Sequence, residues 1–179
     1  GKRMSGILGI PCYGKEILDK ASEISGISRE LMTRYDGRPV IAAYDFLAED
    51  ESALRIPPAR DFITAQVFAS RTLAEKGPCV IVGRNADYVL KDYDHVLSVF
   101  IHGPKDFCMQ EAAKKINLTG KELERFIAKT DKERADYYKY YTGREWTDAR
   151  NYDLCLDSSK LGFERCVDEI IAYMNVRFK

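Results

Sequence analysis

Long apolar runs and an excess of charge of either sign are both missing from this sequence. No stretch of the chain approaches the roughly 18–20 apolar residues that a helix needs to span a bilayer. The 28 Lys and Arg residues balance 28 Asp and Glu residues, so no overall positive field attracts nucleic acid or an anionic membrane surface. We therefore expect neither nucleic acid nor a membrane among the partners.

Paired cysteines are missing too. The five cysteines are scattered and odd in number, no Cys-x-x-Cys occurs, and the two histidines stand without other metal-ligating residues. This pattern excludes a disulfide framework and a structural zinc site, and it is typical of a reduced protein. We expect a cytoplasmic protein without a metal site of its own. With 45% hydrophobic residues among 179, the chain can form one domain with a sizeable core.

The hydrophobic pattern predicts an alternation of helices and strands. Short apolar runs predict strands at 8–14, 79–83, 95–101 and 153–157. Helical periodicity and caps predict helices at 17–24, 28–37, 61–76, after Pro104, from a capping box at 119–122 to about 141, and at 163–174, with a loop at 48–58. Because the strands are mostly apolar rather than alternating, the sequence favours a single α/β domain over 1–179, with one parallel sheet sandwiched by helices.

Arg84 is the first candidate functional residue, because it follows the predicted strand 79–83 directly. Ligands of such sheets bind beyond the carboxyl ends of the strands. Gly83 and Asn85 suit a tight exit from the strand, and an arginine presents a fixed fork of donors that matches phosphate oxygens. A salt bridge at the protein surface is the alternative role for this arginine.

The segment 124–146 is the second candidate. Asp131, Arg134 and Tyr138 share one helical face, and further cations follow along the helix and its exit. Cations spaced in this way can close over the phosphates of a nucleotide, although a run of mixed charges is usually a solvated helix face. The tyrosines at 137, 138, 140 and 141 more often pack against a helix or a dimer interface than stack on a base, which leaves a homodimer open.

Three stretches in this order resemble the cytidylate kinase-like family, relatives of bacterial CMP kinase: GPCVIVGRNADYVL, TDKERADYYKYYTGREW and NYDLCLDSSKLG. The resemblance implies a P-loop nucleoside monophosphate kinase fold with a helical lid at about 104–150. It also implies that ATP donates a phosphoryl group to CMP, dCMP or a related small acceptor. The metal, Mg²⁺, would arrive with the nucleotide.

On the acceptor side, GRN at 83–85 resembles the GRD of CMP kinases, whose arginine holds the acceptor phosphate. The resemblance thus assigns substrate binding to Arg84, Asn85 and Tyr13. Asn85 stands where the family has an aspartate. Gly14 also replaces a common aspartate, in a stretch that resembles the start of the acceptor-binding helices.

On the lid side, the pair Asp131-x-x-Arg134 resembles the Asp-x-x-Arg of the family. The resemblance implies that Arg134 reaches the transferring phosphoryl group, that Asp131 orients it and that Lys132 assists. Lys129 and Arg144 are further expected contacts to substrate.

The motif GxxxxGK[ST] does not occur in the sequence, which opens GKRMSGILGIP. The resemblance implies that the phosphate loop and its strand lie upstream of Gly1, with Gly1 and Lys2 as the candidate contacts to ATP. Arg3 stands where the serine or threonine of such a loop belongs. Two alternatives to a CMP kinase stay open: a nucleotide-binding regulatory protein without catalysis, and a kinase for another small molecule.

Overall fold

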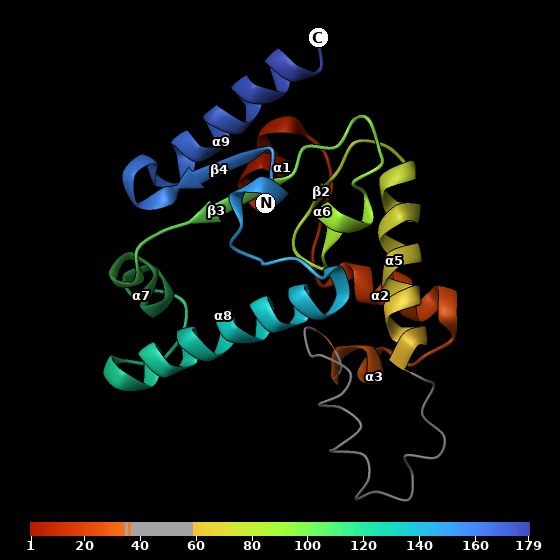
Figure 1. Cartoon of the computed structure of the whole chain (residues 1–179), viewed down its shortest axis with the longest axis horizontal. Helices are drawn as coiled ribbons and strands as arrows, with labels where there is room; N and C mark the ends of the chain where they lie inside the picture. The colour runs from red at the N-terminus through yellow and green to blue at the C-terminus, as the bar shows by residue number, and fades with distance from the viewer. Residues whose placement is uncertain (35, 37–58) are drawn as a thin grey trace, which may run out of the picture. The chain divides into compact units, whose positions relative to one another are not determined.

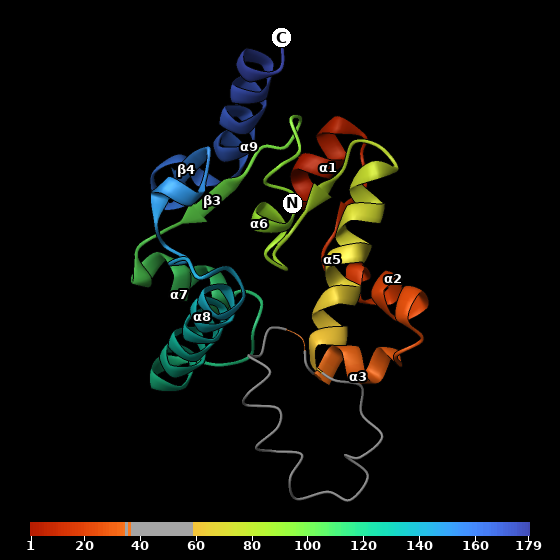
Figure 2. The same cartoon turned by 45° about the vertical axis from the view of Figure 1, so that its right-hand side comes forward.

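A computed structural model describes residues 1–34, 36 and 59–179, and it divides into two compact units, Gly1–Asp92 and Tyr93–Lys179 (Figures 1 and 2). Gly37 and the predicted loop 48–58 lie outside the described residues. The prediction of one domain with a lid at 104–150 stays a prediction.

The first unit contains seven described elements: α1 (Lys2–Leu8), β1 (Cys12–Tyr13), α2 (Glu16–Ser25), α3 (Arg29–Arg34), α5 (Ala59–Glu75), β2 (Val80–Ile81) and α6 (Ala86–Val89). Strands β1 and β2 pair in parallel. The predicted strand 8–14 is mostly wrong, because Leu8 ends a helix that we did not expect and Gly9 then turns the chain with φ 65°. Only Cys12 and Tyr13 extend far enough to pair with β2.

The core of the first unit lies between α2, α3 and α5, and Figures 1 and 2 show α2 beside α5. Its fully buried members include Ile17 and Leu18 on α2, Met32 on α3 and Ala69 on α5. Burying each large apolar side chain contributes about 1.5–3 kcal/mol. Tyr13 and Ile81 pack against this cluster, so the same core also holds β1 and β2.

The second unit contains β3 (Val99–His102), α7 (Lys105–Ala113), α8 (Gly120–Thr142), the short 3₁₀ helix η2 (Ala149–Asn151), β4 (Leu154–Asp157) and α9 (Ser158–Arg177). Strand β3 begins later than predicted, and Ile101 is 44% exposed rather than buried. Pro104 precedes α7 and Gly143 ends α8, both as predicted. The capping box is wrong, because the side chain of Thr119 makes no capping hydrogen bond.

The α/β class and the parallel pairing of strands are confirmed. The prediction of one sheet sandwiched by helices is not met by the described residues. They form two separate two-stranded parallel sheets, β1 with β2 and β3 with β4. A strand joins a sheet only through its backbone N–H and C=O groups. Within the described part of the chain, no other strand pairs with β2 or β3 to extend either sheet.

We predict that Leu18→Ala lowers the free energy of unfolding of the first unit by about 2–5 kcal/mol, because it leaves a cavity in the core between α2 and α5. Denaturant titration followed by circular dichroism measures this change. The matched control is Ile7→Ala, at a side chain that is 59% exposed, and its effect should stay within about 0.5 kcal/mol. Equal losses in both variants would contradict the position of this core.

Candidate functional site

The carboxyl ends of β1 and β2 form one polar edge, because parallel strands end on the same side of a sheet. Tyr13 ends β1, and its carbonyl accepts a hydrogen bond from the N–H of Val82 at 2.8 Å. Gly83, Arg84 and Asn85 follow in the chain. The structure thus brings together Tyr13, Arg84 and Asn85, which the sequence predicted as substrate contacts.

The exit from β2 is a strained turn. Gly83, Arg84 and Asn85 have φ of 77°, 62° and 52°, so two side-chain-bearing residues adopt the left-handed region. The left-handed region costs about 1–2 kcal/mol at Arg84, whereas asparagine enters it more readily. The carbonyl of Asn85 begins α6 by accepting N–H groups from Tyr88 and Val89 at 3.0 and 2.9 Å. Strain of this kind persists only where surrounding contacts fix it, and it concentrates at ligand-binding sites.

Arg84 makes an ion pair that the sequence did not reveal. Its Nη2 donates to Oδ2 of Asp36 at 2.8 Å, and the two side chains are only 16% and 15% exposed. The predicted alternative was a salt bridge at the surface. A salt bridge is present, but it is mostly buried. Asp36 lies 48 residues away, so no local pattern points to it.

Two polar atoms of this pair have no hydrogen-bond partner among the described residues. They are Nε of Arg84 and Oδ1 of Asp36, and both are buried. Buried polar atoms are nearly always hydrogen-bonded in native proteins, so these two are candidate contacts for a ligand.

Three cations act on the carboxylate of Asp36. Burial raises the pKa of this group, while the charges of Arg84, Lys15 and Arg29 oppose the rise. Arg29 also donates to the carbonyl of Lys15 at 3.1 Å, which keeps these two basic residues together. The edge therefore combines one buried carboxylate with several positive charges, an arrangement that suits an anionic ligand.

Glu16 lies at the same edge, after β1. Its pKa is lowered by hydrogen bonds from its own N–H and from that of Gly14, the latter at 2.7 Å, and further by the charges of Lys2 and Arg29. Glu16 belongs to the GKE stretch beside Tyr13, but the sequence analysis assigned it no role.

Gly1 and Lys2, the candidate contacts to ATP, also belong to this unit. A Cβ on Gly1 would lie 2.6 Å from Cγ2 of Val82, so Gly1 packs tightly against the residue that follows β2. Lys2 begins α1 and is exposed. Their role toward ATP stays a prediction.

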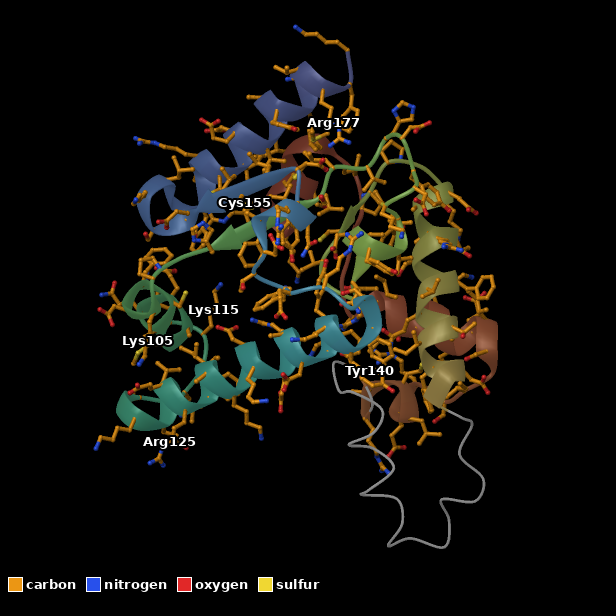
Figure 3. The ribbon with its side chains drawn as sticks, viewed as in Figure 1. Lys105, Lys115, Arg125, Tyr140, Cys155 and Arg177 are labelled. Carbon is orange, nitrogen blue, oxygen red and sulfur yellow. The ribbon has the colours of Figure 1, made fainter. Side chains whose placement is uncertain are left out.

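The predicted lid residues lie on α8 or just after it, and α8 carries ion pairs along its own surface. Arg134 donates to Asp131 at 2.9 Å, Lys132 pairs with Asp136, and Lys129 lies 3.9 Å from Glu133. Arg144 follows the C-cap Gly143 and is exposed. In Figure 3 the side chain of Arg125 on the same helix extends away from the ribbon. These exposed pairs are also those of a solvated helix face, so the lid role stays a prediction.

The tyrosines near the end of α8 pack in part within the protein. Tyr137 and Tyr138 are buried, and the ring of Tyr137 lies 4.8 Å from that of Tyr141. Tyr140, labelled in Figure 3, is 49% exposed. Tyr137 and Tyr138 are thus removed from solvent, in agreement with the expectation that these tyrosines pack rather than stack on a base.

The second unit has a polar edge of its own, where β3 and β4 end in register at His102 and Asp157. Hydrogen bonds from Ser159 lower the pKa of Asp157, and the charge of His102 adds to the effect. Ser158 Oγ donates to the carbonyl of His102 at 2.9 Å. The sequence analysis named none of these residues, although the strand-end rule that located Arg84 applies to them equally.

The described residues contain no group of three or more His, Cys, Asp or Glu side chains arranged to hold a metal ion. In the same part of the chain, every helix is too short or too polar to cross a membrane.

Comparison with known proteins adds three findings. A model of the cytidylate kinase-like family matches residues 1–160. A cytidylate kinase of Methanopyrus kandleri is 31% identical over 98 residues, which cover 50% of this chain and 51% of that protein. The chain therefore spans about half the length of this curated relative. A crystal structure of an uncharacterized protein from Eubacterium ventriosum is similar with a TM-score of 0.72 at 28% identity, covering 98% of this chain and 89% of that one.

We predict that wild type loses stability relative to Asp36→Asn as pH rises from about 3 to 7. The pKa of Asp36 is raised in the folded state, so ionising this carboxyl is less favourable there than in the unfolded chain. Chemical denaturation of both proteins at several pH values gives the difference in the free energy of unfolding. A difference that moves the other way would mean that attraction to Arg84 outweighs burial.

Proposed function

Because the chain belongs to the cytidylate kinase-like family, we propose that it is a phosphotransferase of the nucleoside monophosphate kinase type. ATP is the donor, and CMP or dCMP is the acceptor. The observation that carries this proposal is the strained, mostly buried Arg84 at the carboxyl edge of β1 and β2, with a donor atom left for an anion. Lys15 and Arg29 add positive charge beside it.

In this proposal the protein acts by positioning and by neutralising charge, since phosphoryl transfer asks little covalent chemistry of it. Arg84 binds the acceptor phosphate, and Asn85 and Tyr13 lie close to it. Arg134, held by Asp131, reaches the transferring group together with Lys132, while Lys129 and Arg144 contact substrate. Closure of the segment 104–150 excludes water and so prevents hydrolysis of ATP.

We assign the binding of ATP, the phosphoryl donor, to Gly1 and Lys2. Mg²⁺ is assigned to the phosphates of ATP, because this ion commonly binds through substrate phosphates and retains several waters. Bound in this way, the ion neutralises charge on the phosphates.

We extend the proposal to a P-loop nucleoside monophosphate kinase fold, for which the parallel strand pairs and their connecting helices provide support. We also propose that the protein acts in the cytoplasm. The five cysteines are all free, as expected for a reduced compartment.

A second candidate function is nucleotide binding without catalysis. It is favoured by Asp36, which already occupies Nη2 of Arg84, and by Asn85, which replaces a family aspartate. An assay of phosphoryl transfer from ATP to a panel of nucleoside monophosphates, made with the full-length native protein, separates the two. Transfer to CMP or dCMP supports the kinase, whereas binding of CMP without transfer supports the regulatory protein. Transfer to a different acceptor would redefine the substrate.

We predict that Arg84→Ala weakens binding of CMP by about 1.5–3 kcal/mol, or about 10- to 100-fold in Kd, because a charged hydrogen bond is lost. Isothermal calorimetry measures the affinity, and circular dichroism checks that the variant is folded. Arg71→Ala removes an exposed arginine of the same unit and serves as the matched control. Equal affinity in wild type and Arg84→Ala would refute the assignment.

We predict that Arg134→Gln lowers kcat by about 10²-fold with little change in the Kd of CMP, since its charge acts on the transferring group. Steady-state kinetics and calorimetry measure the two quantities. Arg125→Gln, on the same helix and also exposed, is the control and should keep full activity. If both variants behave alike, α8 is only a solvated helix.

A further inference from the structure

The pair of Arg84 and Asp36 has one buried donor and one buried acceptor without a partner among the residues that the structure describes. Nε of Arg84 and Oδ1 of Asp36 lack partners within the described part of the chain, while Nη2 and Oδ2 are joined at 2.8 Å. A fully ionised anion offers a partner to Nε alone. An anion that retains a proton satisfies both atoms, because its oxygens accept from Nε and its hydroxyl donates to Oδ1.

We infer that Asp36 is a specificity residue of the anion site on Arg84. Because of Asp36, the site binds a phosphate monoester that carries one proton and excludes an anion that carries none, such as sulfate. This inference rests on the proposed function only in placing the acceptor phosphate at Arg84.

The charged groups that act on Asp36 are Arg84 from the exit of β2, Lys15 from the start of α2 and Arg29 from α3. These cations attract phosphate and sulfate alike, because both ligands are anions. The carboxylate of Asp36 repels both anions. Asp36 therefore determines whether the site distinguishes phosphate from sulfate. The distinction depends on a proton that is shared between the carboxylate and the bound anion.

A phosphate monoester can supply that proton near neutral pH, because its second ionisation has a pKa of about 6. In the complex the phosphate keeps this proton and donates it to Oδ1 of Asp36, which has no other partner among the described residues. The complex therefore holds one proton more than the separate dianion and carboxylate. Sulfate has no comparable ionisation, so its approach leaves two unprotonated anions in contact.

Calorimetry of CMP binding at several pH values tests the inference. For wild type we expect the Kd to rise about tenfold per pH unit above about pH 6.5, as coupling to one proton requires. Titrations in buffers of different ionisation enthalpy should show uptake of about one proton. An excess of sulfate should compete weakly.

In Asp36→Asn the amide can donate to a dianion, so we expect a pH slope close to zero and effective competition by sulfate. Glu23→Gln is the matched control, because Glu23 is an exposed carboxylate of the same unit that pairs with Lys20. It should keep the wild-type slope and selectivity. Thermal unfolding shows whether each variant is folded, and the proton uptake of wild type tests the inference without any variant.

The outcomes separate this inference from the proposed function. Binding of CMP by wild type without a pH slope, or equal competition by sulfate in wild type and Asp36→Asn, overturns the inference and leaves a phosphate site on Arg84. If CMP does not bind, the assignment of CMP as the acceptor is wrong. Inorganic phosphate, followed by ³¹P NMR, then serves as the probe of the anion site. A bound resonance that titrates at higher pH than free phosphate supports the inference. Failure of both probes to bind refutes both proposals.

Discussion

The ion pair between Arg84 and Asp36 is the interaction on which the candidate site depends. A guanidinium group that is mostly removed from water needs a partner, since burial of an unpaired charge is strongly unfavourable. Asp36 provides the partner and thereby links the region after α3 to the exit of β2. The left-handed turn at Arg84 and Asn85 is strained by itself, and this pair is one of the contacts that hold it.

The hydrophobic core of the first unit fixes the strand ends on which the candidate site is built. The cluster between α2, α3 and α5 also contacts Tyr13 and Ile81, the last residues of the two paired strands. Because the core holds these strand ends, the turn after β2 begins from a fixed position. A polar site built on such a base is better ordered than one built on a loop alone.

The cations on α8 differ from Arg84 in physical character. Their ion pairs are exposed and join residues three or four positions apart on one helix, so each contributes about 0–1 kcal/mol and exchanges at little cost. Arg84 is instead mostly buried and tied to a residue 48 positions away. Under the proposed function, this contrast suits a fixed contact to the acceptor and movable contacts to the transferring group.

The sequence by itself determined the α/β class, the parallel strand pairing, most of the helices and the position of Arg84 at a strand end. These follow from local signals: the apolar runs 79–83 and 95–101, and helix ends at Gly26 and Gly143. Only the tertiary structure decided that Leu8 belongs to a helix, that the described strands form two sheets, and that Asp36 pairs with Arg84. Partners far apart in sequence leave no periodic pattern, because their contact arises from packing of whole elements rather than from the conformations of neighbouring residues.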